Sequence, residues 1–198
     1  FGRRLPKLRK RVEADMGSRS ITLETVVAGV VRLIDATQIR VGNEQYAREN
    51  KSFGATTLRN RHAKVKGGKL VLSYTGKHGI RRSCTVTDAR LARIAKRTQD
   101  LPGQHLFVCA DAEGNTRPVT SGDVNAYIRE AMDGEFTAKD FRTWGASVIA
   151  FEEMIKRADT GRISLKSVIE PVAEALGNTA AISRKSYVHP ALIDAAKD

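Results

Sequence analysis

The most constraining feature of this sequence is a change of pattern between Ala55 and Val86, in a chain whose other segments read mainly as helices. Strand-forming residues recur in three runs here, near residues 57–65, 70–74 and 80–86, and Gly67-Gly68 separates the first two. Glycine pairs are typical of tight turns between antiparallel strands. We therefore predict one three-stranded antiparallel sheet, with residues 75–79 as the loop of its second hairpin.

Helical spacing predicts helices on both sides of this sheet. Apolar residues of 21–37 recur at intervals of three and four, which indicates a buried helix capped by Ser20 or Thr22. We also expect helices over residues 43–50, over a basic segment that Thr87 caps and that reaches about Thr98, and over residues 121–132. Residues 106–108 are predicted to be extended and residues 111–118 to form a loop.

The carboxyl-terminal third is predicted to be helical as well. Thr137 to Asp140 has the spacing of a capping box, and an apolar stripe follows that indicates a half-buried helix: Phe141, Trp144, Val148, Phe151 and Ile155. Proline is tolerated only in the first turn of a helix, so Pro171 predicts a break near residues 167–170 and a new helix that Gly177 ends. The predicted fold class is α+β, mainly helical, with one compact unit as the default.

The net charge of +12 implies a polyanionic partner, which is usually nucleic acid or an anionic membrane. No apolar run is long enough to span a bilayer, and none resembles a signal peptide. Two cysteines, Cys84 and Cys109, give no disulfide framework, and there is no Cys/His cluster at zinc spacing. We expect a cytoplasmic protein, nucleoid-associated if the source is a bacterium, with no metal and no membrane partner.

The positive charge is concentrated in the middle of the chain. Residues 59–97 carry twelve Lys and Arg against the single acid Asp88. These basic residues alternate with strand-forming residues rather than with acids, which favours binding to phosphates. Six more basic residues lie among the first eleven, and for these a solvated helix face is an equal alternative.

Five polar residues in four separated segments could carry chemistry: Arg40, Lys77, Arg142, Asn178 and Tyr187. Each also has an ordinary structural explanation, such as a helix-end arginine, a turn lysine, an arginine at the edge of the core, an amide helix cap or a packed phenol. The segment around Lys77 is no phosphate-binding P-loop, because His78 stands where that motif needs Ser or Thr and no helix follows.

Taken together, these residues fit attack by a tyrosine on a phosphodiester. Such a reaction passes through a pentacoordinate phosphorane with extra negative charge, and guanidinium groups match its paired oxygens. The leaving 5′ oxygen must take up a proton, which a lysine on a hairpin can supply.

The order and spacing of these segments resemble the type IB DNA topoisomerases, especially the short viral and bacterial branch. The resemblance runs from about Ile21 to Pro190 and rests on five motifs: Ile39-Arg-Val-Gly42 with Tyr46, Gly54-Ala-Thr-Thr-Leu-Arg-Asn-Arg-His62, Gly76-Lys77, Lys139-Asp-Phe-Arg-Thr-Trp-Gly145, and Leu176-Gly-Asn-Thr179 followed by Ser183-Arg-Lys-Ser-Tyr187. It implies a helical catalytic domain with a small sheet over residues 1–198, without the family's small amino-terminal domain. Because the chain opens at Phe1 rather than Met, we also expect that residues precede it.

The resemblance implies a role for each residue. Tyr187 would be the nucleophile, Arg40 and Arg142 would hold the phosphorane, and Lys77 would be the general acid. Many relatives have histidine where this chain has Asn178, and an amide there would donate a hydrogen bond with less dependence on pH. We expect DNA contacts from Tyr46 and from seven basic residues: Arg59, Arg61, Lys64, Arg81, Arg82, Arg184 and Lys185.

The implied activity is relaxation of supercoiled double-stranded DNA by a monomer, through a 3′-phosphotyrosyl intermediate, without ATP, metal or another cofactor. A tyrosine recombinase is an alternative with the same chemistry, although its usual His-x-x-Arg would place histidine where this chain has Lys139. A DNA-binding module in which Tyr187 is only structural is the third reading.

Overall fold

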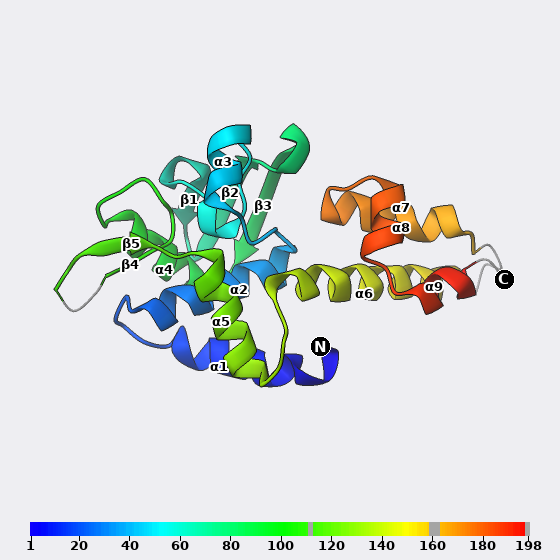
Figure 1. Cartoon of the computed structure of the whole chain (residues 1–198), viewed down its shortest axis with the longest axis horizontal. Coiled ribbons are helices and arrows are strands. Elements are labelled where there is room, and N and C mark those ends of the chain that lie inside the picture. The colour runs from blue at the N-terminus through cyan, green and yellow to red at the C-terminus, as the bar shows by residue number, and fades with distance from the viewer. Residues whose placement is uncertain (111–112, 159–162, 197–198) are drawn as a thin grey trace. The chain divides into compact units, whose positions relative to one another are not determined.

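The computed structural model describes residues 1–110, 113–158 and 163–196 (Figure 1). The chain divides into two compact units, Phe1–Ala138 and Lys139–Asp198, rather than the single unit expected, and each is described by itself. The predicted class is confirmed, because helices predominate and a three-stranded antiparallel sheet lies among them. No helix in the described part of the chain is both long and apolar enough to cross a membrane.

The first unit is built around α2 (Leu23–Thr37), which packs against α1 (Leu5–Asp15), α4 (Ala89–Gln99) and α5 (Ser121–Met132). Apolar side chains of α2 are almost completely buried, as its spacing predicts. Thr22 caps this helix, since its hydroxyl oxygen accepts a hydrogen bond from the Thr25 amide at 3.3 Å. The helix therefore begins at Leu23, which confirms Thr22 rather than Ser20 of the two predicted caps, and the predicted bounds of α5 are also confirmed.

The predicted sheet is formed by β1 (Ala63–Lys66), β2 (Lys69–Thr75) and β3 (Arg81–Thr87), in that order. Gly67 and Gly68 turn the chain between β1 and β2 with φ angles of 55° and 74°. The first strand is shorter than predicted, because Ala55–Thr57 and Asn60–His62 are 3-10 turns. Side-chain hydrogen bonds to the backbone, such as that from the Arg59 amide to His62 Nδ1, compete with strand pairing there.

Two further boundaries differ from the prediction. Asp88 rather than Thr87 caps α4, because its Oδ1 accepts from the Arg90 and Leu91 amides at 3.0 Å. Thr87 ends β3 and pairs with Lys69. A second sheet joins β4 (Val108–Ala110) to β5 (Thr116–Pro118), so the predicted loop is wrong over residues 116–118, and residues 111–112 lie outside the described part of the chain. Three-residue strands are too short to show alternation in the sequence.

The second unit contains α6 (Ala138–Ala158), which starts at the boundary, and then α7 (Leu165–Leu176), α8 (Ala180–Ser186) and α9 (Pro190–Ala195). The helices α7 and α8 lie against each other. Their core is one cluster of buried apolar side chains, to which α6 contributes two alanines: Ala146, Ala150, Val168, Ile169, Val172, Leu176, Val188 and Ala196.

The predicted buried stripe on α6 is only partly correct. Phe141 is buried, but the exposed fractions of Trp144, Phe151 and Ile155 are 42%, 53% and 55%. The face that packs in the core of this unit carries Ala146 and Ala150 instead. Small side chains allow neighbouring helices to approach closely, and the spacing of the larger apolar residues could not reveal this choice of face.

The break predicted near residues 167–170 is absent from α7, which is continuous from Leu165 to Leu176 with Pro171 inside it. Ser164 caps the helix by accepting from the Ser167 amide at 3.2 Å. Proline removes one helical hydrogen bond. Burial of five apolar side chains on one face of the continuous helix offsets that loss. The predicted end at Gly177 is confirmed.

Candidate active site

Arg40 lies in the first unit, on the segment that leaves α2, and its backbone is held against a second segment. The Arg40 carbonyl accepts a hydrogen bond from the Ala55 amide at 2.8 Å. A Cβ atom at Gly54 would lie 2.5 Å from that carbonyl oxygen and 2.6 Å from the Cα of Gly42, which has a φ angle of +98°. Only glycine fits at both places, so crowding between two backbones fixes the position of Arg40.

Tyr46 and Lys77 are brought together in the same unit. Tyr46 lies on α3 (Glu44–Asn50), where its amide donates to the capping Asn43 side chain at 2.8 Å. Lys77 lies at the tip of the β2–β3 hairpin, in a turn where His78 has a φ angle of 65°. The Lys77 ammonium is 5.9 Å from the centre of the Tyr46 ring, within the range of a cation–π contact. The predicted general acid therefore lies beside the predicted DNA-contacting tyrosine.

Arg59 is one of the basic residues that we expect to contact DNA, and its guanidinium belongs to an ion-paired network. Its guanidinium lies 2.6 Å from Glu44 Oε1, and its other terminal nitrogen contacts the His105 ring. His105 Nε2 is 3.0 Å from Glu44 Oε2. Partial burial would raise the pKa of Glu44, but hydrogen bonds and charges from His105 and Arg59 outweigh it and hold that pKa below its usual value.

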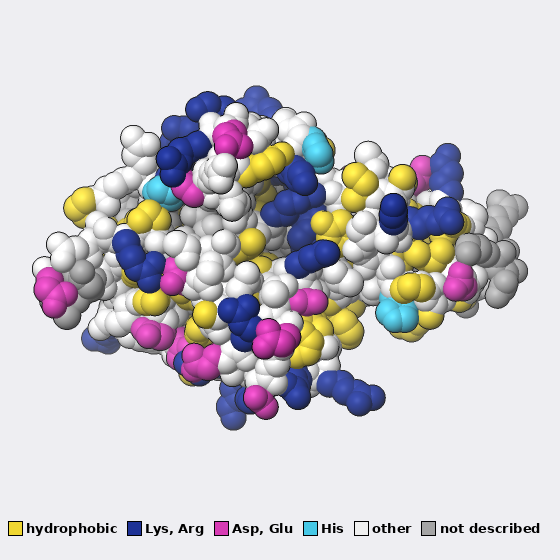
Figure 2. All heavy atoms as spheres, viewed as in Figure 1, with side chains coloured by type: hydrophobic (Ala, Val, Ile, Leu, Met, Phe, Trp, Pro, Cys, Tyr) yellow, Lys and Arg dark blue, Asp and Glu magenta, His cyan; other side chains and the backbone are white. Residues whose placement is uncertain are grey.

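The remaining basic residues of the central block are more open. Lys and Arg side chains gather over the region of α3 and the three-stranded sheet (Figure 2). Arg61, Lys64 and Arg81 are exposed, and Arg82 is half-buried. Arg61 and Arg81 line a cavity of about 400 Å³, and the Arg61 guanidinium lies 5.9 Å from the Phe53 ring centre.

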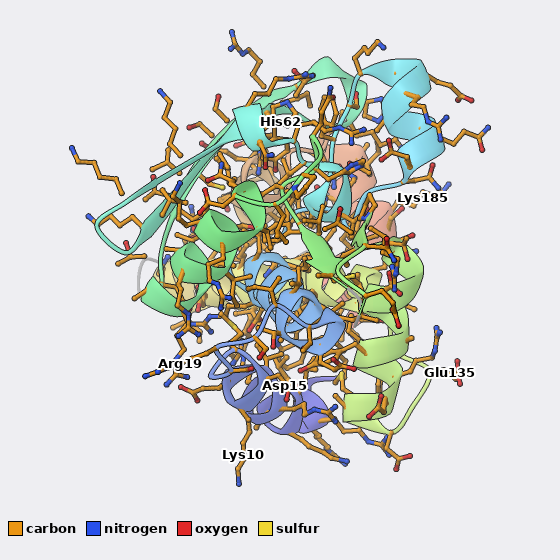
Figure 3. All side chains as sticks on the ribbon, turned by 90° about the vertical axis from the view of Figure 1, so that its left-hand side faces the viewer. Lys10, Asp15, Arg19, His62, Glu135 and Lys185 are labelled. Carbon is orange, nitrogen blue, oxygen red and sulfur yellow. The ribbon has the colours of Figure 1, made fainter. Side chains whose placement is uncertain are left out.

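His62 lines the same cavity, on the side of the first unit away from α1 (Figure 3). Burial lowers the pKa of His62, and the charges of Arg61 and Arg59 lower it further. The ring is therefore neutral at pH 7, and since Nδ1 accepts from the Arg59 amide, Nε2 carries the proton. The cavity thus combines cationic side chains with a neutral N–H donor.

The amino-terminal basic run on α1 is partly neutralised. Arg9 pairs with Asp35 at 2.8 Å, and Arg11 pairs with Asp15 at the same distance. Lys10 extends away from the helix (Figure 3). We therefore interpret this basic run as a solvated helix face with local ion pairs.

The second unit contains Arg142, Asn178 and Tyr187. Tyr187 follows α8 directly, and its amide donates to the Ser183 carbonyl at 3.1 Å. Arg142 lies on α6 with an exposed fraction of 4%. The guanidinium carbon of Arg142 is 5.1 Å from the centre of the Tyr187 ring, and one terminal nitrogen donates to the Leu176 carbonyl at 3.0 Å.

Asn178 lies beside this contact, because it follows the left-handed Gly177 that ends α7. The Asn178 amide donates to the Ala173 carbonyl at 2.9 Å, and its side-chain nitrogen is buried. Arg184 and Lys185 are exposed in the last turn of α8. The structure thus brings Tyr46 close to Lys77 in the first unit and Arg142 close to Tyr187 in the second.

Sequence reasoning missed three contributors: Glu44, His105 and the Leu176 carbonyl. Glu44 and His105 contact Arg59 across 15 and 46 positions of sequence, and nothing in their local pattern shows the pairing. A backbone carbonyl has no sequence signature at all. Within the described residues, no three His, Cys, Asp or Glu side chains gather as a metal site requires.

Comparison with known proteins identifies a family. The model of the family described as "Eukaryotic DNA topoisomerase I, catalytic core" matches residues 1–196. A protein named DNA topoisomerase 1B from Acanthamoeba polyphaga mimivirus is 34% identical over 200 residues, which cover 95% of this chain and 60% of that protein. DNA topoisomerase 1 of Schizosaccharomyces pombe is 30% identical over 75% of this chain and 18% of its own length.

Relatives of lower identity also match this chain over only part of their own length. DNA topoisomerase 1B of vaccinia virus (strain Copenhagen) is 24% identical over 81% of this chain and 50% of the viral protein. The chain therefore spans between about a fifth and three fifths of the curated relatives it matches.

Solved structures show a likeness in fold. A XerH site-specific recombinase bound to palindromic difH substrate, in a post-cleavage complex, has a TM-score of 0.58 and 20% identity, covering 97% of this chain and 50% of the recombinase. A pre-cleavage complex of XerH with difH substrate has a TM-score of 0.53 and 18% identity, covering 96% of this chain and 52% of the recombinase.

Proposed function

The chain belongs to the family of DNA topoisomerase I catalytic cores, and from that premise we propose that it relaxes supercoiled duplex DNA. It acts as a type IB enzyme, by cutting one strand, letting the cut strand rotate, and resealing it. Residues 1–198 serve as the catalytic domain.

The observation that carries this proposal is the contact of Tyr187 with Arg142. A buried guanidinium 5.1 Å from the centre of the tyrosine ring holds a positive charge beside the proposed nucleophile. The same cation can stabilise charge that develops on the phenolic oxygen and on the phosphate.

The reaction exchanges one ester for another. The phenolic oxygen of Tyr187 attacks the phosphorus, its proton passes to solvent, and the bond from phosphorus to the 5′ oxygen breaks. Arg40 and Arg142 bind the non-bridging oxygens of the phosphorane, and Asn178 donates a hydrogen bond to one of them. Lys77 gives its proton to the leaving 5′ oxygen.

The product is a 3′-phosphotyrosine and a free 5′-hydroxyl end. The reverse reaction reseals the strand, so the step needs no ATP and no metal. One chain carries every group that the mechanism uses, so the enzyme works as a monomer. Exposed basic residues of the central block, with Arg184 and Lys185, hold the phosphates of the duplex.

Capture of the covalent intermediate tests this function. Mixing the 198-residue chain with a radiolabelled duplex that traps cleavage should give an adduct on a denaturing gel, mapped to Tyr187. The Tyr187→Phe variant should give no adduct and no plasmid relaxation, while its affinity for duplex stays within a few fold. Equal relaxation by both proteins would refute the role of Tyr187.

The same experiment separates the alternatives. A recombinase would require two paired sites, whereas the proposed enzyme relaxes a plasmid without any such site. A DNA-binding module would bind duplex but form no adduct.

A further inference from the structure

We propose that Gly177 is a positioning residue for catalysis, because its left-handed backbone at the end of α7 aims the Leu176 carbonyl at Arg142. This inference rests on the proposed function and deepens it. Gly177 itself touches no reacting atom. It acts through Arg142, whose guanidinium meets both the carbonyl and the Tyr187 ring.

The first step of the argument concerns Arg142. A guanidinium carries five N–H donors and is always charged, so a buried one requires fixed acceptors. One terminal nitrogen of Arg142 donates to the Leu176 carbonyl at 3.0 Å. This bond fixes one edge of the planar group, and the plane then lies against the Tyr187 ring.

The second step concerns the carbonyl. The last four carbonyls of a helix have no partner within the helix. At the end of α7, the Gly177 amide donates to the Ala173 and Glu174 carbonyls, and the Asn178 amide donates to Ala173 as well. The Leu176 carbonyl lies beyond these bonds and serves Arg142. The negative end of the helix dipole favours a cation at this point.

The third step concerns Gly177. Its φ and ψ angles are 61° and 49°, in the left-handed region. A change of φ at Gly177, coupled to the opposite change of ψ at Leu176, turns the peptide that carries the Leu176 carbonyl, because the buried Leu176 side chain holds its own Cα atom in the core. The conformation of Gly177 therefore sets the direction of the Arg142 anchor. It also sets where Asn178 begins.

Substitutions at Gly177 can test whether cleavage depends on the left-handed backbone at this position. Alanine is strained in the left-handed region, whereas asparagine is tolerated there. In a single-turnover cleavage assay at saturating DNA, Gly177→Ala should slow cleavage by roughly tenfold, and Gly177→Asn should stay within about threefold of wild type. Duplex affinity should be unchanged in both variants.

A matched control addresses strain alone. Gly67 has a φ angle of 55°, close to that of Gly177, and a Cβ there would meet nothing within 4 Å. Gly67→Ala introduces similar backbone strain in a turn that carries no catalytic group, so it should leave the cleavage rate unchanged. Melting temperatures of all three variants will show whether each is folded under the conditions of the assay.

A double variant tests whether Gly177 acts through Arg142. On a substrate with a 5′-bridging phosphorothiolate, whose better leaving group keeps slow rates measurable, Gly177→Ala should cause no further slowing in an Arg142→Ala background. Equal slowing with and without Arg142 would overturn the inference, as would a wild-type rate for Gly177→Ala. If the wild-type chain forms no adduct, the proposed function fails first and this inference with it.

Discussion

The ammonium group of Lys77 lies 5.9 Å from the centre of the Tyr46 ring, which joins a hairpin tip to a short helix in the first unit. Both residues are accessible, since Lys77 is exposed and the exposed fraction of Tyr46 is 36%. The aromatic ring gives the Lys77 cation a defined position at the tip of the hairpin. The general-acid role proposed for Lys77 and this position of its cation can be tested separately.

Lys77→Ala should slow cleavage at an ordinary 5′ oxygen by roughly a hundred- to ten-thousandfold, because the leaving oxygen loses its proton donor. A 5′-bridging phosphorothiolate needs no such donor and should largely restore the rate. Lys69→Ala, at another exposed lysine of the same sheet, is the control and should cleave at the wild-type rate when DNA is saturating. Failure of the sulfur substrate to rescue Lys77→Ala would show that the lysine has another role.

Tyr46→Leu should slow cleavage of saturating DNA by roughly two- to fivefold, the effect of losing an exposed cation–π contact. Tyr46→Phe keeps the ring and should cleave at the wild-type rate. In a Lys77→Ala background, Tyr46→Leu and Tyr46→Phe should cleave DNA at equal rates. A persistent difference there would mean that Tyr46 acts independently of Lys77.

Glu44→Gln should destabilise the protein at pH 7 by about 0.5 to 1 kcal/mol, the range of exposed ion pairs, and equilibrium denaturation will measure the loss. The folded state lowers the pKa of Glu44, so its stabilising contribution is present above the unfolded value and disappears as the pH falls through the folded value. Wild type and variant should therefore converge in acid. A difference that grows on acidification would contradict this assignment.

Asp123→Asn should likewise reduce stability above pH 4, and this effect should disappear as the pH falls through about 2. The Arg117 guanidinium holds the pKa of Asp123 at about 2, against the opposing effect of partial burial, and Thr120 contributes two hydrogen bonds. Since the group is partly exposed, we expect a loss of about 1 kcal/mol near pH 6, measured by urea denaturation. Asp100→Asn, at a more exposed i,i+4 pair with Lys96, should show less change.

The salt dependence of duplex binding should distinguish the arginines of the central block. Arg61→Ala and Arg81→Ala should each lower the slope of log K against log salt by about 1, because each removes a cation that releases a counterion. Arg59→Ala should change the slope less, because Glu44 already neutralises its charge. Identical slopes for all three variants would contradict the division between paired and open cations.

Strong local signals explain what the sequence could predict. The bounds of α5 and the Gly67-Gly68 hairpin follow from spacing and turn chemistry that act over a few residues. The nucleophilic role proposed for Tyr187 follows from the motifs that resemble the topoisomerase family, not from the spacing of apolar residues. The contact between Tyr187 and Arg142 is compatible with that role.

What the sequence could not predict depends on partners that are distant in the chain. Arg59 reads as one more basic residue, yet Glu44 and His105 occupy its guanidinium. The large apolar residues of α6 suggest its buried face, yet two alanines pack in the core of the second unit. Pro171 predicts a break, but the energy of packing along α7 outweighs one missing hydrogen bond.

The contact between Gly54 and the backbone of Arg40 and Gly42 has a consequence for genetics. Even a single methyl group at position 54 would collide with the backbone of Arg40. A substitution of Gly54 should therefore reduce activity as a substitution of Arg40 does, although the side chains expected to contact DNA are unchanged. Screens for inactive alleles should therefore recover changes at a residue that has no side chain of its own to bind nucleic acid. Around Arg40, the tolerance of the sequence to variation is limited by available space as well as by chemistry.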